Sequence, residues 1–418
     1  MNYEMVSATI QYFDNATQNN HLEDEPVLTE RGLIRVRGAS SRRFDKKGYA
    51  LKIKEENLVD GKDVSFSGMT ADDDWILHGP FLDKTLIRNY MCYNLAGEIM
   101  EYAPNVRFCE AYLNGDYIGV YLLTEKISYN ESGRISIEKS DSDIAETSFI
   151  VEMDRKPEDT TRELETFATY SFINVKAENE SMGYLQVSYP GNTLTEAQKT
   201  FIESYISRFE KSLYSFAYND EKEGYAKYID IDSFVDYFLI NEFTLNYDAM
   251  GLSTYIYKDI GDKMKLCVWD FNSAFDYHEH SVITPETFLM QNLGWYKYLF
   301  KDEKFVEKVE KRYYDLREIY FNETYLCNYI DETVAYLGPA IGRNYERWGY
   351  SFNKWYNGQN YDYLYPESRN VRSYEEAITQ LKDCITLRVE HMDKNIDRLY
   401  LLCHESMNKK YNYDKEAN

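Results

Sequence analysis

Several features that define common protein classes are missing from this sequence. Its 418 residues include six cysteines, but no two of them form a CxxC pair. Neither a zinc-binding motif nor a disulfide scaffold is therefore indicated, and we expect mostly buried thiols. No stretch of about 18 apolar residues occurs, so hydropathy predicts no membrane span. The opening residues, MNYEMVSATIQYFDN, lack the basic segment and apolar core of a signal peptide.

An excess of positive charge is also missing. The chain has 71 acidic and 47 basic residues, which gives a formal net charge of −24. Long-range attraction to nucleic acid or to an anionic membrane is therefore not expected. A phosphate group would need a local basic pocket. At 418 residues the chain exceeds what one compact core usually needs, so we expect two lobes.

Short strands dominate the sequence before about residue 190. Segments 33–38 and 49–54 alternate apolar and polar residues with the two-residue period of a half-buried strand. Segment 108–127 reads as a hairpin, because Asn114-Gly115 favours the positive φ angles of a tight turn. A further strand is predicted at 148–154, and one helix at about 84–101 interrupts the strands.

Helices dominate after residue 190. Thr195 and Gln198 have the spacing of a capping box and predict a helix that begins there. Segment 232–243 is apolar nearly all round, which indicates a buried central helix. Further helices are predicted at about 303–322, 326–338 and 373–400. The expected fold is therefore α+β, with a β-rich lobe at 1–190 and a mainly helical lobe at 191–418.

Two acids follow buried segments in the second half. Asp248 lies just past the helix at 232–243, and Asp270 directly follows the apolar segment LCVW (266–269). A carboxylate at the end of an apolar strand costs free energy unless a partner compensates it. If the two acids meet, they favour a divalent cation or a shared proton. The alternative is that they are two unrelated capping or turn acids.

Basic residues gather in one segment of the first half. The turn at residues 38–41 consists of small residues whose backbone N–H groups can approach an anion. Lys52 lies near the end of the next strand, where its ammonium group can reach a phosphate. A solvated strand face is the alternative. The basic residues of the segment are Arg35, Arg37, Arg42, Arg43, Lys46, Lys47, Lys52 and Lys54.

These residues carry a resemblance to a known family. The segment RGASSRRFDKKGYALKIK (37–54) resembles the RGNSSR-x-x-x-KK-x-Y-x-x-K stretch of the CotH family of spore-coat atypical protein kinases. The similarity covers roughly residues 30–280, with a compatible helical tail to about residue 400. It continues, in the family's order, through DWILHGPFLDKTLIRNYM (74–91), YLNGDYIGVYLLTEKI (112–127), NYDAMGLSTYIYKD (246–259) and VWDFNSAFD (268–276).

The resemblance implies a divergent, two-lobed protein-kinase-like fold that uses ATP and a divalent metal (Mg²⁺, or Mn²⁺ or Ca²⁺). The implied activity is phosphorylation of serine, or threonine, on protein substrates, and a strongly acidic chain favours basic ones. Asp248 matches the acid of the family's catalytic loop, and Asp270 matches its metal-binding acid. Lys52 matches the lysine that contacts the ATP phosphates. Arg88 and Glu125 also lie on family motifs, with a role toward Lys52 or the nucleotide.

The sequence departs from the family pattern at three positions. Ala39 replaces the usual Asn, Asn272 stands where Asp is often found, and Asp276 stands where Gly is common. An Asn can still bind Mg²⁺ through its carbonyl oxygen, so this change would only weaken or retune metal binding. None of the three changes affects Asp248, Asp270 or Lys52, so we expect an active enzyme. By resemblance the protein belongs to the spore coat or the cell surface. Two alternatives remain: a non-catalytic coat or surface assembly module, and a kinase-fold enzyme that transfers AMP.

Overall fold

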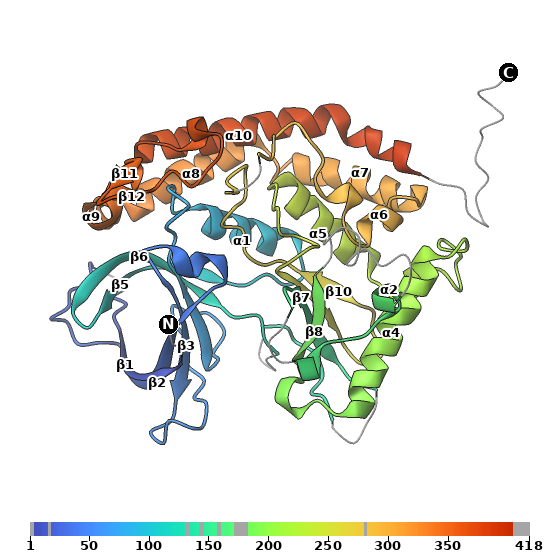
Figure 1. Ribbon diagram of the computed structural model, residues 1–418, viewed down its shortest axis with the longest axis horizontal. Helices are drawn as coiled ribbons and strands as arrows, with labels where there is room; N and C mark the ends of the chain where they lie inside the picture. The colour runs from blue at the N-terminus through green and yellow to red at the C-terminus, as the bar shows by residue number, and fades with distance from the viewer. Residues whose placement is uncertain are drawn as a thin grey trace.

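The protein has a mixed α/β fold with a curled N-terminal sheet. The computed structural model describes residues 4–15, 18–129, 134–141, 146–156, 160–170, 183–279 and 282–403. Figure 1 shows the N-terminal sheet and a second, smaller sheet side by side beneath a layer of helices. The predicted α+β class, with a sheet in the N-terminal region and helices, is therefore confirmed.

The N-terminal sheet has six strands in the order β1-β2-β3-β4-β6-β5, and every neighbouring pair is antiparallel. Asn114 and Gly115 have φ angles of 52° and 84° and connect β5 to β6, which confirms the predicted hairpin. One face of the sheet packs around Leu51, Ile53 and Trp75 as a small core. The strands are β1 (Val6–Tyr12), β2 (Leu28–Arg37), β3 (Gly48–Lys54), β4 (Asp74–His78), β5 (Val106–Leu113) and β6 (Asp116–Glu125).

The second sheet joins segments that are far apart in the sequence. Its order is β10-β9-β7-β8, again with antiparallel neighbours. The sheet therefore pairs strands from both sides of residue 190, so the boundary between the two expected lobes stays a prediction. The strands are β7 (Phe149–Asp154), β8 (Tyr184–Tyr189), β9 (Thr254–Lys258) and β10 (Lys265–Cys267).

Helices make up most of the rest of the chain. Thr195 accepts from the backbone N–H of Gln198, whose side chain accepts from the N–H of Thr195, so the predicted capping box is confirmed. Helix α5 is buried over most of its length, as expected. The helices are α1 (Arg88–Ile99), α2 (Phe167–Tyr170), α4 (Glu196–Tyr214), α5 (Ile231–Phe243), α6 (Tyr296–Leu299), α7 (Glu303–Arg317), α8 (Glu323–Leu337), α9 (Pro339–Trp348) and α10 (Tyr374–Asn395).

Some elements differ from the prediction. Helix α1 begins at Arg88 rather than at residue 84, because the carboxylate of Asp83 accepts from the backbone N–H groups of Thr85 and Arg88. This contact fixes a turn in which Leu86 has a φ of 66°. Strands β1, β4 and β8, helix α9 and the small hairpin β11 (Trp355–Tyr356) and β12 (Gln359–Asn360) were not predicted.

The main hydrophobic core lies between the second sheet and the helices. Residues of α1, α4, α5, α7 and α10 pack there against β7 and β9. In the part of the chain that the structure describes, no helix is long and apolar enough to cross a membrane. None of the six cysteines, all of which lie in the described ranges, forms a disulfide bond. Three of them, Cys92, Cys267 and Cys384, are buried, and the other three are partly exposed.

Candidate functional site

The loops that carry Asp248 and Asp270 lie against each other. The backbone N–H of Phe275 donates to the carbonyl of Thr244, with 2.7 Å between nitrogen and oxygen. The side-chain amide of Asn246 donates to the carbonyl of Trp269 at 3.4 Å. The segment that follows α5 and the segment that follows β10 are therefore joined by hydrogen bonds, which brings the loops of Asp248 and Asp270 together.

Both loops hold strained backbone. Eleven non-glycine residues have a positive φ in the described ranges, and six of them fall between residues 245 and 276. This left-handed region costs about 1–2 kcal/mol for an ordinary L-residue. Such conformations persist only where surrounding contacts enforce them, and they gather at functional sites. The six are Leu245, Met250, Ser253, Asp270, Phe275 and Asp276.

Asp270 carries a charge that its surroundings do not fully compensate. The pKa of its carboxyl is raised to about 6, mainly by burial and in addition by the nearby charge of Asp248. The guanidinium of Arg37 and the backbone N–H of Asn272 act in the opposite direction but do not cancel these effects. Arg37 extends from the end of β2, and its guanidinium carbon lies 5.9 Å from the ring centroid of Trp269. The N-terminal sheet thus reaches the Asp270 loop directly.

Asp248 is partly buried and has a raised pKa as well. Burial is the main cause, and Asp154 at the end of β7 adds to it, whereas Arg155 lowers the pKa. Asp154 also contributes to the raised pKa of Asp270. Three carboxylates from different elements therefore lie within each other's electrostatic influence. A bound cation would relieve this mutual repulsion.

The donor atoms around Asp270 fit a divalent cation. The amide of Asn272 lies against both carboxylate oxygens of Asp270 and, with its nitrogen turned toward them, donates to each. A flip of this amide places its oxygen beside the carboxylate, and carboxylate and amide oxygens are ligands that Mg²⁺ prefers. Within the described ranges, no group of three His, Cys, Asp or Glu side chains is preassembled as a metal cluster. A cation here would rely on Asp270, Asn272 and ligands from outside the chain.

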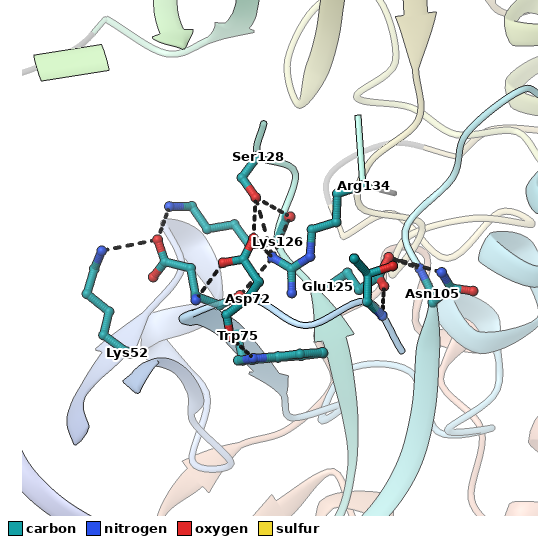
Figure 2. Close-up of polar contacts among 10 residues, drawn as sticks. Lys52, Asp72, Trp75, Asn105, Glu125, Lys126, Ser128 and Arg134 are labelled. Carbon is teal, nitrogen blue, oxygen red and sulfur yellow. Dashed lines mark hydrogen bonds and ion pairs between the residues drawn. The ribbon is translucent and has the colours of Figure 1, made fainter. Parts of the chain in front are cut away.

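A positively charged face lies on the N-terminal sheet. Lys52 of β3 is paired with Asp74 of β4, and its Nζ is 3.1 Å from a carboxylate oxygen of Asp74. The Nζ of Lys126 is 2.8 Å from the same oxygen. In Figure 2, dashed lines join the ammonium groups of Lys52 and Lys126 to one carboxylate. Directly paired residues of an antiparallel sheet share a face, so the register places Arg35 and Arg37 on the face that carries Lys52.

This charged face points toward the second sheet. Lys126 and Arg37 both lower the pKa of Glu152 on β7, although burial keeps that pKa raised overall. Arg37 acts on Asp270 as well. The cationic face of the first sheet and the acids of the second unit are therefore close enough to interact.

Other members of the basic segment have structural contacts. The turn after β2 forms a short 3-10 helix, η1 (Ser40–Arg43). Lys47 donates to the carbonyls of Arg42 and Phe44, and the buried Lys46 donates to Val120 and Asn344. Lys46 and Lys47 of the basic segment therefore make contacts within the fold, whereas Arg35 and Arg37 share a sheet face with Lys52.

The side chains of Glu125 and Arg88 contact other residues than Lys52. Glu125 is paired with Trp75 and so lies on the opposite face of the sheet from Lys52. Its buried carboxylate accepts from the backbone N–H groups of Thr70 and Asn105 (Figure 2). Arg88 is fully buried, pairs with Asp83 at 2.6 Å and donates through Nε to the carbonyl of Ala274. Asp74 is the carboxylate that orients Lys52.

Comparison with known protein families shows the family of this chain. The family model described as CotH kinase protein matches residues 34–392. This chain belongs to the CotH kinase family. The matched range includes Lys52, Asp248 and Asp270, together with both sheets apart from β1 and the start of β2. A search of curated proteins found no match.

Several residues around the candidate site were not predicted from the sequence. Asp74 and Lys126 lie inside the motifs quoted above, but the contacts of Lys52 and Lys126 with Asp74 depend on strand register. Arg37 was noted only as part of a basic segment, although its position two residues after Arg35 indicates a shared strand face. Asp154 is the last residue of the strand predicted at 148–154, much as Asp270 follows an apolar segment. The same pattern could therefore have identified Asp154 as a candidate site residue.

Proposed function

We propose that this protein is an ATP- and divalent-metal-dependent atypical protein kinase that phosphorylates serine, or threonine, on protein substrates. The observation that carries the proposal is Asp270, which lies three residues past the end of β10 and has a pKa raised to about 6 despite the opposing charge of Arg37 from the other sheet. Membership of the CotH kinase family supports the same reaction class. The proposed fold is a divergent, two-lobed kinase-like one, with the nucleotide between the two sheets.

Each charged group has a distinct role in this proposal. Asp270 and Asn272 would hold the divalent cation, which supplies charge neutralisation at the phosphates. Lys52 and Lys126 would bind phosphate oxygens, with Asp74 keeping both ammonium groups on one side of the sheet. Arg37 would add a third positive charge near the same point. Phosphoryl transfer depends mainly on such positioning and charge stabilisation.

Asp248 is assigned to the acceptor side. Its pKa is raised by burial, which brings the carboxyl group closer to the range in which it can accept a proton. Its loop is tied to the Asp270 loop, so an acceptor hydroxyl bound at Asp248 would lie beside the phosphates. We therefore propose that Asp248 orients the hydroxyl and accepts its proton. Arg88 and Glu125, earlier expected to contact nucleotide, are assigned to supporting the loops.

The proposed partner is a basic protein segment that contains serine. The net charge of −24 favours association with positively charged chains and disfavours acidic ones. The family relationship indicates a protein substrate rather than a small molecule. Assignment to the spore coat or cell surface follows from the family alone and is not part of the structural argument.

Incubation with labelled ATP tests the proposal. The protein is mixed with Mg²⁺, a generic basic protein, and ATP labelled at either the γ- or the α-phosphate. Transfer of the γ label alone, with a mass increase of one phosphate on the acceptor, supports the kinase. Transfer of the α label supports the AMP-transfer alternative. No transfer, together with no Mg²⁺-dependent binding of ATP, supports a non-catalytic assembly module.

A further inference from the structure

Three residues of helix α1 contact the backbone that carries Asp270. The hydroxyl of Tyr93 accepts from the N–H of Asp270 at 2.9 Å. The Oδ1 atom of Asn89 accepts from the N–H of Phe271 at 2.8 Å, and the Nε of Arg88 donates to the carbonyl of Ala274 at 2.9 Å. Consecutive parts of the loop are therefore held by side chains from one helix, which lies about 180 residues earlier in the chain.

The positions of these side chains follow from helix geometry. Asn89 and Tyr93 are four residues apart, so they project from the same face of α1. The ring of Tyr93 also packs against both neighbours of Asp270, with centroid distances of 5.9 Å to Trp269 and 5.5 Å to Phe271. The packing fixes the ring, and the ring places the hydroxyl.

Asn89 is itself oriented by the N-terminal sheet. Its Nδ2 lies 3.0 Å from the Nε2 of His78, the last residue of β4. Burial lowers the pKa of His78 to about 4, so the imidazole is neutral near pH 7 and Nε2 can accept from the amide. The amide nitrogen is thereby engaged, and Oδ1 is left for Phe271.

The backbone at Asp270 requires such support. Its φ of 58° lies in the left-handed region, which is unfavourable for an aspartate without compensating contacts. Phe275 and Asp276 in the same loop share this property. Relaxation of Asp270 to an ordinary conformation would turn its carboxylate away from the place it now occupies beside Asn272. The contacts from α1 oppose that relaxation.

We propose that Tyr93 and Asn89 are positioning residues that lock Asp270 in its strained conformation and so present its carboxylate to the divalent cation. This inference rests on the proposed function for the cation, but the lock itself is a property of the protein alone. Tyr93 and Asn89 contact neither substrate nor nucleotide in this scheme. They act through the backbone of the loop.

The variants Tyr93→Phe and Asn89→Ala test the lock. Tyr93→Phe keeps the ring and removes only the hydroxyl, so folding should be preserved. Tyr296→Phe is the matched control, because Tyr296 is also fully buried and its hydroxyl donates to a backbone carbonyl, that of Phe234 at 2.6 Å. The three variants are compared with the unmodified protein in two measurements. One is hydrogen exchange of the backbone amides without nucleotide, and the other is the affinity for ATP with and without Mg²⁺.

We expect faster exchange of the amides between residues 268 and 277 in Tyr93→Phe and Asn89→Ala, and no change there in Tyr296→Phe. Binding of ATP in the presence of Mg²⁺ should weaken about 10–100-fold, as for other residues that orient a metal ligand. Binding of ATP without metal should stay unchanged, which a general loss of folding would not produce.

The two hypotheses fail in different ways. Unchanged exchange in the loop would overturn the lock, whatever happens to nucleotide binding. Faster exchange with unaltered Mg²⁺-dependent binding would overturn its role in presenting Asp270. If the unmodified protein binds no ATP with Mg²⁺ while the loop still loosens in the variants, the proposed function fails and the lock stands as a feature of the fold.

Discussion

Lys52 and Asp74 are directly paired residues of β3 and β4, and the Nζ of Lys52 lies 3.1 Å from a carboxylate oxygen of Asp74. Lys126 contacts the same oxygen at 2.8 Å. Burial alone would raise the pKa of Asp74, but the ammonium groups of Lys126 and Lys52 lower it overall. One carboxylate therefore orients two lysines that remain partly exposed and available to an anion.

The first prediction is that Lys126 contributes to phosphate binding alongside Lys52. We expect Lys52→Met and Lys126→Met each to weaken ATP binding by about tenfold, corresponding to a lost charge-assisted hydrogen bond of about 1.5 kcal/mol. Isothermal titration with ATP measures the effect. Lys62→Met is the control, because Lys62, in the loop between β3 and β4, pairs with Glu30 of β2 at 2.6 Å. Wild-type affinity in Lys126→Met would remove this residue from the site.

The second prediction concerns the stability of Asp270→Asn. Because the folded-state pKa of Asp270 is raised from 3.8 to about 6, the folded state binds the proton more tightly than the unfolded state. This group therefore destabilises the fold progressively as the pH rises from about 4 to about 6, and fully above that. Asp270→Asn removes the penalty, so the variant should be more stable than the wild type by about 1–3 kcal/mol at pH 7, with little difference below pH 4.

Urea denaturation at several pH values measures this difference. Metal ions are left out and a chelator is added, because a bound cation would mask the effect. A variant that is less stable than the wild type at pH 7 would mean that the Asp270 carboxylate is well compensated in the folded protein. Asp270 would then need no cation to balance its charge.

The third prediction separates Asp248 from the metal. If Asp248 orients the acceptor hydroxyl, Asp248→Asn should lower kcat by orders of magnitude and leave the affinity for ATP with Mg²⁺ nearly unchanged. Such a profile means that the lost interaction was made in the transition state rather than in the ground state. Steady-state kinetics and nucleotide titration on the same preparation give both quantities. If Asp248→Asn weakens ATP binding as much as Asp270→Asn does, Asp248 is a metal ligand instead.

The fourth prediction is that Arg88 has a structural role. Arg88 and Asp83 are both buried, and their side chains are 2.6 Å apart. Arg88→Met leaves the Asp83 carboxylate without its cation, which should cost about 3–5 kcal/mol of unfolding free energy. Arg343→Met is the control, because Arg343 pairs with Glu110 on the surface, where such a pair contributes at most about 1 kcal/mol. Unchanged stability with lost ATP binding would assign Arg88 to the nucleotide.

Local patterns in the sequence predicted many elements of this fold. The two-residue alternation at 49–54 corresponds to β3, and the capping box at Thr195 begins α4. The position of Asp270 after an apolar segment indicated an uncompensated charge, which its raised pKa bears out. These features depend on residues close together in the chain, where side-chain periodicity and capping chemistry act directly.

Long-range pairing could not be predicted in the same way. Which residue lies opposite Lys52 is set by the register of β3 and β4, and a shift of one residue would have placed a different side chain there. The same register places Glu125 on the other face of the sheet. The pairing of β7 with β9, about 100 residues later, likewise depends on packing rather than on local sequence. Contacts of this kind define most of the site around Asp270.

The role of Asp270 in holding the metal is measured directly by the binding of ATP to the wild type and to Asp270→Asn, each with and without Mg²⁺, by isothermal titration at pH 7.5. We expect Mg²⁺ to strengthen ATP binding to the wild type by at least about tenfold, or about 1.4 kcal/mol, and to have no such effect on the folded variant. Equal strengthening in both proteins, or none in the wild type, would contradict the assignment of Asp270 as the residue that holds the metal.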